Sequence, residues 1–341
     1  MKHLNTIFVF LRQLNIVLRL IFFFILIIIS CGSSKNSNPY LNSGFGYVDV
    51  KGGEIWYGIL GEGDKAPYLY LHGGPGGKSK GGAYLNAISE NRPIILMDQL
   101  GGGLSTYHED TSLLKVENFV DQVKALTDKL NLNEFYLTGH SWGTALALEY
   151  YLKYPKGVKG IVFNSPYFST SIWVADCDTL ITQLPDTTQQ HIEIAEKINV
   201  FNTRTYQNAM RVFYQNFMIR SIDVNWDSIP GYELFDNSFR NMDVRGNNFI
   251  YNYMWGPSEF SPTGTLINYD IHQALSKILV PVLFTTGEYD EARPSTVKRL
   301  ASFVSDVDYV EIPNAGHASS IDNPQVLIKA HRDFANRIDK E

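Results

Sequence analysis

Residues 138–144 read TGHSWGT, with a serine between two glycines. The stretch follows the apolar run FYLTG (135–139) and precedes TALALEYYLK (144–153), which is rich in helix-forming residues. A strand that passes into a helix through G-x-S-x-G is typical of a nucleophile elbow, a strained turn that raises the serine hydroxyl above a sheet. The turn has room only for small residues two positions before and after the serine, and Gly139 and Gly143 fill both. The pattern predicts Ser141 as a nucleophile, and the alternative is an ordinary tight turn.

Outward from this motif, short apolar runs alternate with amphipathic stretches such as VENFVDQVKALTDKL (116–130). This alternation predicts βαβ units and an α/β fold with a parallel sheet. The expected buried strands are YLYLH (68–72), PIILMD (93–98), FYLTG (135–139), GIVFN (160–164), VPVLFTTG (280–287) and VDYVEIP (307–313). Two earlier runs, GYVDV and EIWYGIL, are separated by KGG and predict an antiparallel hairpin at the sheet edge.

The alternation of strand and helix stops between about residues 165 and 269. QQHIEIAEKI and YQNAMRVFYQNFMIR in this region are helical and polar-aromatic, and no clear sheet strand interrupts them. We therefore expect a core in two parts, residues 45–165 and 270–341, with residues 166–269 inserted as a helical cap over the carboxyl edge of the sheet.

A serine nucleophile needs a general base, and the base needs an orienting carboxylate. Asp290 follows one expected strand in TTGEYDEARP, and His317 follows the next in PNAGHAS, so both lie in loops at the same sheet edge as Ser141. We expect the side chain of His140 to point away from the site. Three other histidines fall in helical or cap segments and are expected to be surface or packing residues: His191, His272 and His331.

The stretch YLYLHGGPGGKS resembles a phosphate-binding loop, but the spacing fails because that motif requires glycine where His72 stands. We interpret it as an oxyanion loop, in which the backbone N–H of Gly74 approaches the substrate carbonyl and that of Trp142 is the second donor. The alternative is a purely structural loop.

The N-terminus has the pattern of an export signal. Basic residues precede the apolar run LIFFFILIII (20–29), which is shorter than the roughly 20 residues needed to span a bilayer. The run ends at Ser30-Cys31 and is followed by a polar Gly/Ser/Asn stretch, which resembles a bacterial lipoprotein processing site. We expect residues 1–30 to be a signal peptide, Cys31 to be lipidated and residues 31–44 to be a tether. The alternatives are a short membrane anchor and an ordinary cleaved signal.

Composition excludes several classes of function. The net charge is −6 with 19% charged residues, and there is no basic stripe for a phosphate backbone, so we expect no nucleic-acid partner. There are only two cysteines and no HExxH motif, which argues against a zinc site. We expect no cofactor and no metal.

Taken together, the motifs resemble the proline iminopeptidase (prolyl aminopeptidase) family of the α/β-hydrolase fold, which includes the tricorn-interacting aminopeptidases. The resemblance rests on six stretches in the family's order, from about Gly46 to the C-terminus: HGGPGG (72–77), DQLGGGLS (98–105), GHSWGT (139–144), MWGPSEF (254–260), GEYDEARP (287–294) and AGH (315–317). It implies a mostly parallel eight-stranded sheet flanked by helices, with an inserted helical cap.

The resemblance also implies roles for individual residues. The nucleophile, acid and base fall on Ser141, Asp290 and His317, and Glu259 and Glu291 match two glutamates that hold the substrate's free α-amino group. Without the resemblance, each glutamate would be a solvated surface carboxylate. Two departures leave the triad untouched: Leu104 stands where many relatives have arginine, and Ala145 where many have leucine or serine.

These observations predict an exported, lipid-anchored serine aminopeptidase that faces the periplasm or the cell surface. It would release an N-terminal residue, with proline expected, from short peptides with a free N-terminus through an acyl-enzyme. One alternative is a carboxylesterase or amidase on the same scaffold. The other is a non-catalytic binding protein that keeps the fold.

Overall fold

The computed structural model describes residues 41–106, 109–221 and 246–340. The expected signal peptide and Cys31 lie outside these ranges, as do most of the tether and part of the cap. Within the described ranges, no helix combines the length and apolarity needed to cross a bilayer.

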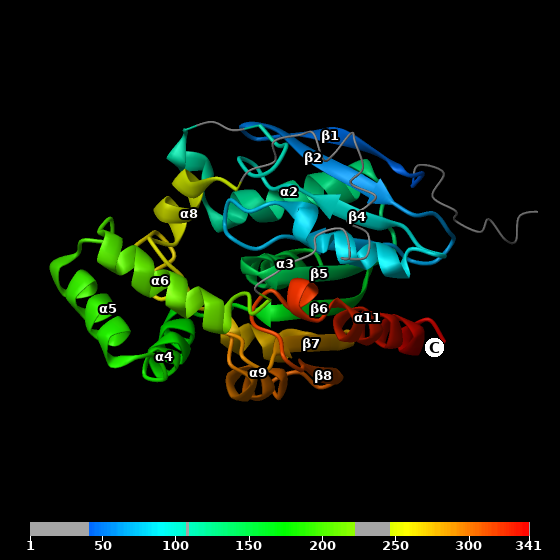
Figure 1. Ribbon diagram of the computed structural model, residues 1–341. Helices are drawn as coiled ribbons and strands as arrows, with labels where there is room; N and C mark the ends of the chain where they lie inside the picture. Colours follow the sequence, from blue (N-terminus) through cyan, green and yellow to red (C-terminus); the bar gives the residue numbers. More distant parts are fainter. Residues whose placement is uncertain (1–40, 107–108, 222–245, 341) are drawn as a thin grey trace, which may run out of the picture. The chain divides into compact units, whose positions relative to one another are not determined.

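An eight-stranded sheet organises the described chain (Figure 1). The strands follow the order β1-β2-β4-β3-β5-β6-β7-β8, and every neighbouring pair from β4 to β8 is parallel. The predicted α/β architecture with a mostly parallel eight-stranded sheet is confirmed. The strands are β1 (Gly44–Val50), β2 (Gly53–Leu60), β3 (Tyr68–Leu71), β4 (Ile94–Met97), β5 (Phe135–Ser141), β6 (Val158–Pro166), β7 (Val282–Gly287) and β8 (Val307–Ile312).

The predicted edge hairpin is confirmed as β1 and β2, which pair antiparallel with Val50 opposite Gly53. β2 also pairs antiparallel with β4, so the hairpin extends the parallel part of the sheet at one edge. The remaining strands lie where the apolar runs predicted them, although β5 and β6 each continue about two residues further and reach the candidate site.

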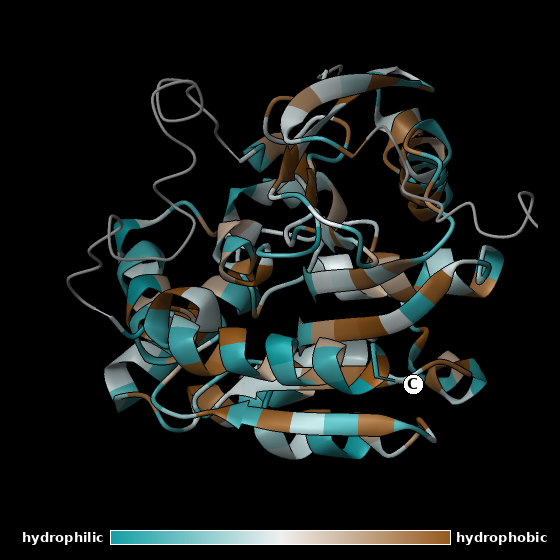
Figure 2. Cartoon of the chain, turned by 90° about the vertical axis from the view of Figure 1, so that its right-hand side faces the viewer, coloured by the Kyte–Doolittle hydropathy of each residue, from teal (hydrophilic) through white to brown (hydrophobic). Residues whose placement is uncertain are grey.

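Alternation along the strands divides the core between the two faces of the sheet. Leu69 and Leu71 of β3 join the cluster covered by α2 (Val116–Lys129), α3 (Trp142–Lys153) and α9 (Pro294–Ala301). Tyr68 and Tyr70 join the cluster under η1 (Ser79–Ile88) and α11 (Pro324–Ile338). The helices show bands of brown and teal in Figure 2, as expected for elements that bury one side.

Four helices of the expected cap are described: α4 (Thr170–Ile181), α5 (Asp186–Ile198), α6 (Arg204–Phe217) and α8 (Asn248–Met254). In α6, Tyr206, Ala209, Phe213 and Phe217 recur every three or four residues and form its buried stripe. No sheet strand occurs in the described part of 166–269 beyond the end of β6. These helices lie at the carboxyl ends of β5 to β7 (Figure 1), where a cap was predicted. The boundaries of the cap, residues 166 and 269, stay a prediction.

Candidate active site

Ser141 ends β5 and immediately precedes α3, as the elbow prediction requires. Its φ and ψ are 53° and −126°, a conformation that costs a non-glycine residue free energy and occurs most often at functional sites. The flanking glycines allow the turn. A Cβ on Gly139 would lie 2.3 Å from the carbonyl oxygen of Gly143, and one on Gly143 would lie 2.1 Å from that of Leu71.

His317 and Asp290 meet at the carboxyl edge of the sheet. The His317 Nδ1 lies 2.8 Å from Asp290 Oδ1, and both side chains are buried. The Asp290 carboxylate also accepts hydrogen bonds from the N–H of Ala292 at 2.8 Å and from the N–H of Gly287 and the hydroxyl of Thr286, each at 3.2 Å. The structure thus brings together the acid and base that the strand ends predicted.

The pair shifts the pKa of each partner. Burial alone would raise the pKa of Asp290, but the charge of His317 and the hydrogen bonds from His317 and Ala292 lower it below its ordinary value. Burial alone would lower the pKa of His317, but the charge and hydrogen bond of Asp290, with a smaller contribution from Glu259, raise it. An ionised carboxylate that favours the imidazolium is the arrangement a general base needs.

Backbone contacts from the cap hold the His317 loop. The N–H of His317 donates to the carbonyl of Phe217 at 2.8 Å, and the N–H of Ala318 donates to that of Met218 at 2.9 Å. The Asp322 carboxylate joins the same two segments, because it accepts from the N–H of Gly316 at 2.9 Å and from the N–H groups of Arg220 and Ser221. The candidate base therefore sits on the end of α6.

His140 corrects one prediction. Its ring was expected to point away from the site, but its centroid lies 4.8 Å from that of His317, and its Nε2 donates to the His317 carbonyl at 3.0 Å. Ser165 donates to the same carbonyl at 3.0 Å. Burial, followed by the charge of His317, lowers the pKa of His140 to about 4. A neutral His140 thus holds the His317 loop through its hydrogen bond and does not compete with His317 for a proton.

The HGGPG loop passes beside the serine. A Cβ on Gly73 would lie 2.9 Å from the Cβ of Ser141, so the backbone approaches the serine as closely as an oxyanion loop must. Gly74 has a φ of +115°, a conformation that side chains rarely adopt. The predicted oxyanion donors, Gly74 and Trp142, both line the same cavity as Ser141.

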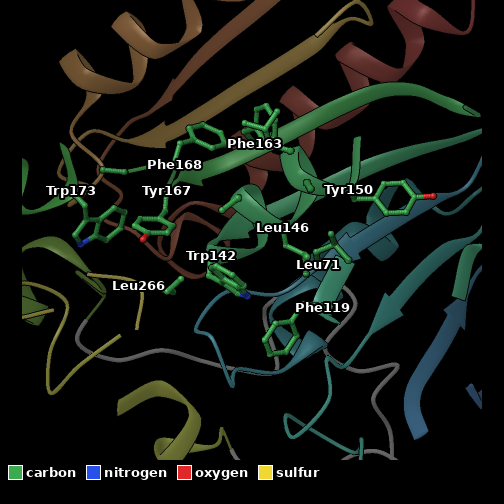
Figure 3. Packing of buried hydrophobic residues seen from close by; sticks show 14 of the residues in the cluster. Leu71, Phe119, Trp142, Leu146, Tyr150, Phe163, Tyr167, Phe168, Trp173 and Leu266 are labelled. Carbon is green, nitrogen blue, oxygen red and sulfur yellow. The ribbon is translucent and has the colours of Figure 1, made fainter. Parts of the chain in front are cut away.

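That cavity is narrow and has an aromatic wall. Sheet and cap contribute to its lining: Gly74, Pro75, Ser141, Trp142, Tyr167, Trp173, Trp255, Glu259 and Leu266. Figure 3 shows Trp142, Tyr167, Trp173 and Leu266 gathered at the strand ends. Trp173 also contacts His317: the two rings pack edge to face, with a centroid distance of 5.4 Å.

Glu259 is the acidic member of the cavity lining. Its Oε1 accepts a hydrogen bond from Tyr251 of α8 at 2.7 Å, and its backbone carbonyl accepts one from the Trp173 indole at 2.9 Å. Burial raises the pKa of Glu259, while the charge of His317 and the bond from Tyr251 oppose the rise. The role of Tyr251 was missed, because nothing in the sequence distinguishes it from the other 19 tyrosines.

Glu291 is fully buried, and neither of its carboxylate oxygens has a hydrogen-bond partner. Its Oε1 lies 3.8 Å from His317 Nδ1. Burial, Glu259 and Asp290 together raise its pKa well above the ordinary value. The alternative of a solvated surface carboxylate is therefore wrong for Glu291, and Glu259 is at most partly exposed. Among the described residues, no group of three or more His, Cys, Asp or Glu side chains is arranged to hold a metal ion.

Comparison with known proteins identifies relatives of this chain. Residues 67–324 match the family model described as the alpha/beta hydrolase fold. A proline iminopeptidase of Heyndrickxia coagulans is 35% identical over 295 residues, which cover 86% of this chain and 99% of the relative. The chain belongs to the proline iminopeptidase family. A second member, from Lactobacillus helveticus strain DPC 4571, is 30% identical over 300 residues and is covered over 98% of its length.

Solved structures share the fold of this chain. The crystal structure of VinJ matches with a TM-score of 0.76 and 28% identity, over 87% of this chain and 99% of that protein. The proline iminopeptidase of Mycobacterium smegmatis matches with a TM-score of 0.75 over the same shares, and its 24% identity supports the fold alone. The predicted family, the α/β-hydrolase fold and a prolyl aminopeptidase-like hydrolase are confirmed.

Proposed function

We propose that this protein is a serine aminopeptidase that releases one N-terminal residue, with proline the expected residue, through an acyl-enzyme. The observation that carries the proposal is the buried Glu291, whose carboxylate has no hydrogen-bond partner and interacts with Glu259 beside the cavity that contains Ser141. A buried carboxylate without hydrogen bonds is costly in the free protein, and a cationic ligand would offset that cost. The α-ammonium group of a peptide is such a ligand.

The chemistry follows from the arrangement of the triad. Ser141 Oγ attacks the first peptide carbonyl while His317 takes its proton, and the N–H groups of Gly74 and Trp142 stabilise the oxyanion. The C–N bond then breaks, and His317 delivers the proton to the leaving amine. Water, activated by the same imidazole, hydrolyses the acyl-enzyme. Asp290 holds the imidazole in the required tautomer throughout.

The cavity favours removal of a single residue. Its narrow space and aromatic wall beside Ser141 suit one compact apolar residue. The glutamates would hold the substrate's amino group, so an N-acetylated peptide would lose that charge interaction. The names of the relatives support proline as the residue released.

Three substrates test the proposal against its alternatives. We expect cleavage of proline or alanine anilide, little cleavage of its N-acetylated form, and loss of turnover by several orders of magnitude in Ser141→Ala with the fold intact. A fluorophosphonate probe should label Ser141. Equal cleavage of blocked and free substrates, with fast hydrolysis of short acyl esters, would favour the esterase or amidase. Absence of labelling and turnover would favour a binding protein, and activity lost to a chelator but not to a serine reagent would exclude the triad.

We also propose that the protein is exported and anchored to a membrane through a lipid on Cys31. The support is the short apolar run that ends at Ser30-Cys31, followed by a polar tether. The protein should appear in the membrane fraction with an added mass at a new N-terminal Cys31, and Cys31→Ser should be soluble or unprocessed. Cleavage at another position with Cys31 unmodified would contradict this proposal.

A further inference from the structure

Gln99 directly follows Asp98 at the end of β4 and is buried to 1% exposure. Every polar group of its side chain is used. The amide Nε2 donates to the carbonyl of His72 at 2.9 Å, and the amide Oε1 accepts from the indole Nε1 of Trp142 at 2.9 Å. Its backbone N–H donates to the ring Nε2 of His72 at 3.0 Å. One glutamine therefore binds two segments that lie 27 and 43 residues away in the chain.

These two segments carry the two proposed oxyanion donors. His72 immediately precedes Gly73-Gly74, and Trp142 supplies the second donor from the first residue of α3. β4 and β5 are not neighbours, because β3 lies between them. The Gln99 side chain spans this gap: it starts at the end of β4, binds the chain that leaves β3, and reaches the residue that follows β5.

The separation of the two segments matters for catalysis. An oxyanion hole works when both donors lie about 2.7–3.1 Å from the position that the negative oxygen will occupy, and small displacements cost large factors in rate. The backbone of the HGGPG loop is glycine-rich and conformationally permissive, so external hydrogen bonds must define its position. In this structure, His72 receives two such bonds from Gln99.

We propose that Gln99 is a positioning residue that sets the distance between the two halves of the oxyanion hole. This inference rests on the proposed serine hydrolase function. It predicts that Gln99 acts on the transition state and not on the binding of the substrate's amino group, because its hydrogen bonds reach the two segments that carry the oxyanion donors.

The chain offers a matched control for this inference. Gln122 on α2 is equally buried, at 2% exposure, and its Oε1 accepts a hydrogen bond from the N–H of Leu100 at 2.9 Å. Gln99→Met and Gln122→Met each remove a buried side-chain amide. The amide of Gln122 binds Leu100, the residue that follows Gln99. Only the first removes the side-chain bonds to the His72 carbonyl and the Trp142 indole, while the backbone N–H of residue 99 keeps its bond to the His72 ring.

We would measure kcat and KM for an N-terminal aminoacyl anilide, the rate of fluorophosphonate labelling at Ser141, and the Tm of each variant. In Gln99→Met, kcat and the labelling rate should fall roughly 10- to 100-fold, with KM within about threefold of the wild type. In Gln122→Met, both rates should stay within about threefold at a similar loss of Tm. Trp142→Phe removes the indole N–H, and combined with Gln99→Met it should cost little more than the more damaging single change.

Other results would overturn the inference. A wild type that is not labelled would remove the proposed function and this inference with it. A labelled wild type with Gln99→Met labelled equally fast would refute the role of Gln99 alone. A KM that rises as much as kcat falls, an equal loss of kcat in Gln122→Met, or full additivity with Trp142→Phe would assign Gln99 a merely structural role.

Discussion

Two buried histidines, one at the carboxyl edge of the sheet and one on α11, have opposite environments. His317, at the carboxyl edge, faces the ionised Asp290, and its pKa is raised. His331, on α11, has its Nε2 3.1 Å from the Tyr84 hydroxyl and 3.2 Å from Asn164 Oδ1, and its Nδ1 has no partner. Burial lowers the pKa of His331 to about 3.

The comparison teaches that burial alone does not make a histidine useful. Both rings have lost their hydration, but only His317 has a carboxylate that stabilises its charged form. None of the described residues that hydrogen-bond His331 is acidic. One environment therefore suits a group that must gain and lose a proton, and the other suits a neutral packing residue, as was predicted for His331.

The largest expected effect on activity comes from removing the carboxylate beside His317, so that its surroundings resemble those of His331. Asp290→Asn removes the charge beside His317, so the pKa of His317 should fall and the orienting hydrogen bond should favour the wrong tautomer. We expect kcat to fall by roughly 10³- to 10⁴-fold with the fold retained, as steady-state kinetics and circular dichroism would show. A variant that keeps more than a tenth of wild-type kcat would remove Asp290 from the triad.

The next effect separates two adjacent carboxyl groups. Asp290 is fully hydrogen-bonded and Glu291 has no hydrogen-bond partner, so Glu291→Gln should leave the triad intact and weaken only the binding of ammonium groups. We expect Glu291→Gln or Glu259→Gln to lower kcat/KM for free N-termini by roughly 2 to 4 kcal/mol. Hydrolysis of a small uncharged ester is the control and should change much less. Full aminopeptidase activity in both variants would contradict the proposed amine site.

A pH profile sharpens the same distinction. The pKa of Glu291 is raised, so the group is protonated over a wider range of pH, and an ammonium substrate requires it to ionise. The ratio of kcat/KM for the anilide to that for the ester should therefore rise with pH, by up to about tenfold per unit, until the substrate amine itself loses its proton. His317 affects both substrates and cancels in the ratio. The rise should shrink in Glu291→Gln, and a flat wild-type ratio would argue against the proposal.

The smallest effect on activity is expected at His331, where the change is in stability. The pKa of His331 is about 3 in the folded protein and ordinarily 6.5. Between these two pH values, the unfolded chain binds a proton at His331 and the folded chain does not. Its contribution is therefore complete above pH 6.5 and is lost as the pH falls toward 3, by up to about 1.4 kcal/mol per unit. Urea unfolding of His331→Asn should show a shallower acid loss than the wild type. The exposed His191 on α5 provides the control, since His191→Asn should leave the slope unchanged.

The sequence predicts the sheet well because strand periodicity and the elbow are local features. The order Ser141, Asp290, His317 follows from strand ends that meet at one edge, and the structure joins the last two at 2.8 Å. The roles of Glu259 and Glu291 came from resemblance alone. Their burial depends on how the cap covers the sheet, which no local pattern records.

Two contacts show where sequence reasoning stops. His140 precedes Ser141, and its side chain was expected to point away from the site. The prediction was wrong because the His317 loop folds back over it. Gln99 belongs to the recognisable DQLGGGLS stretch, but its partners are 27 and 43 residues away. Such distant pairings depend on the strand order, which the sequence does not specify.

The backbone bonds between α6 and the His317 loop have a consequence for modularity. A cap inserted between two strands suggests a module that could be replaced by the cap of a relative to change the range of substrates. Here the carbonyls of Phe217 and Met218 hold His317 and Ala318. A graft that replaced this cap would also replace the support of the general base, so the cap and the triad must be inherited, or engineered, as one unit.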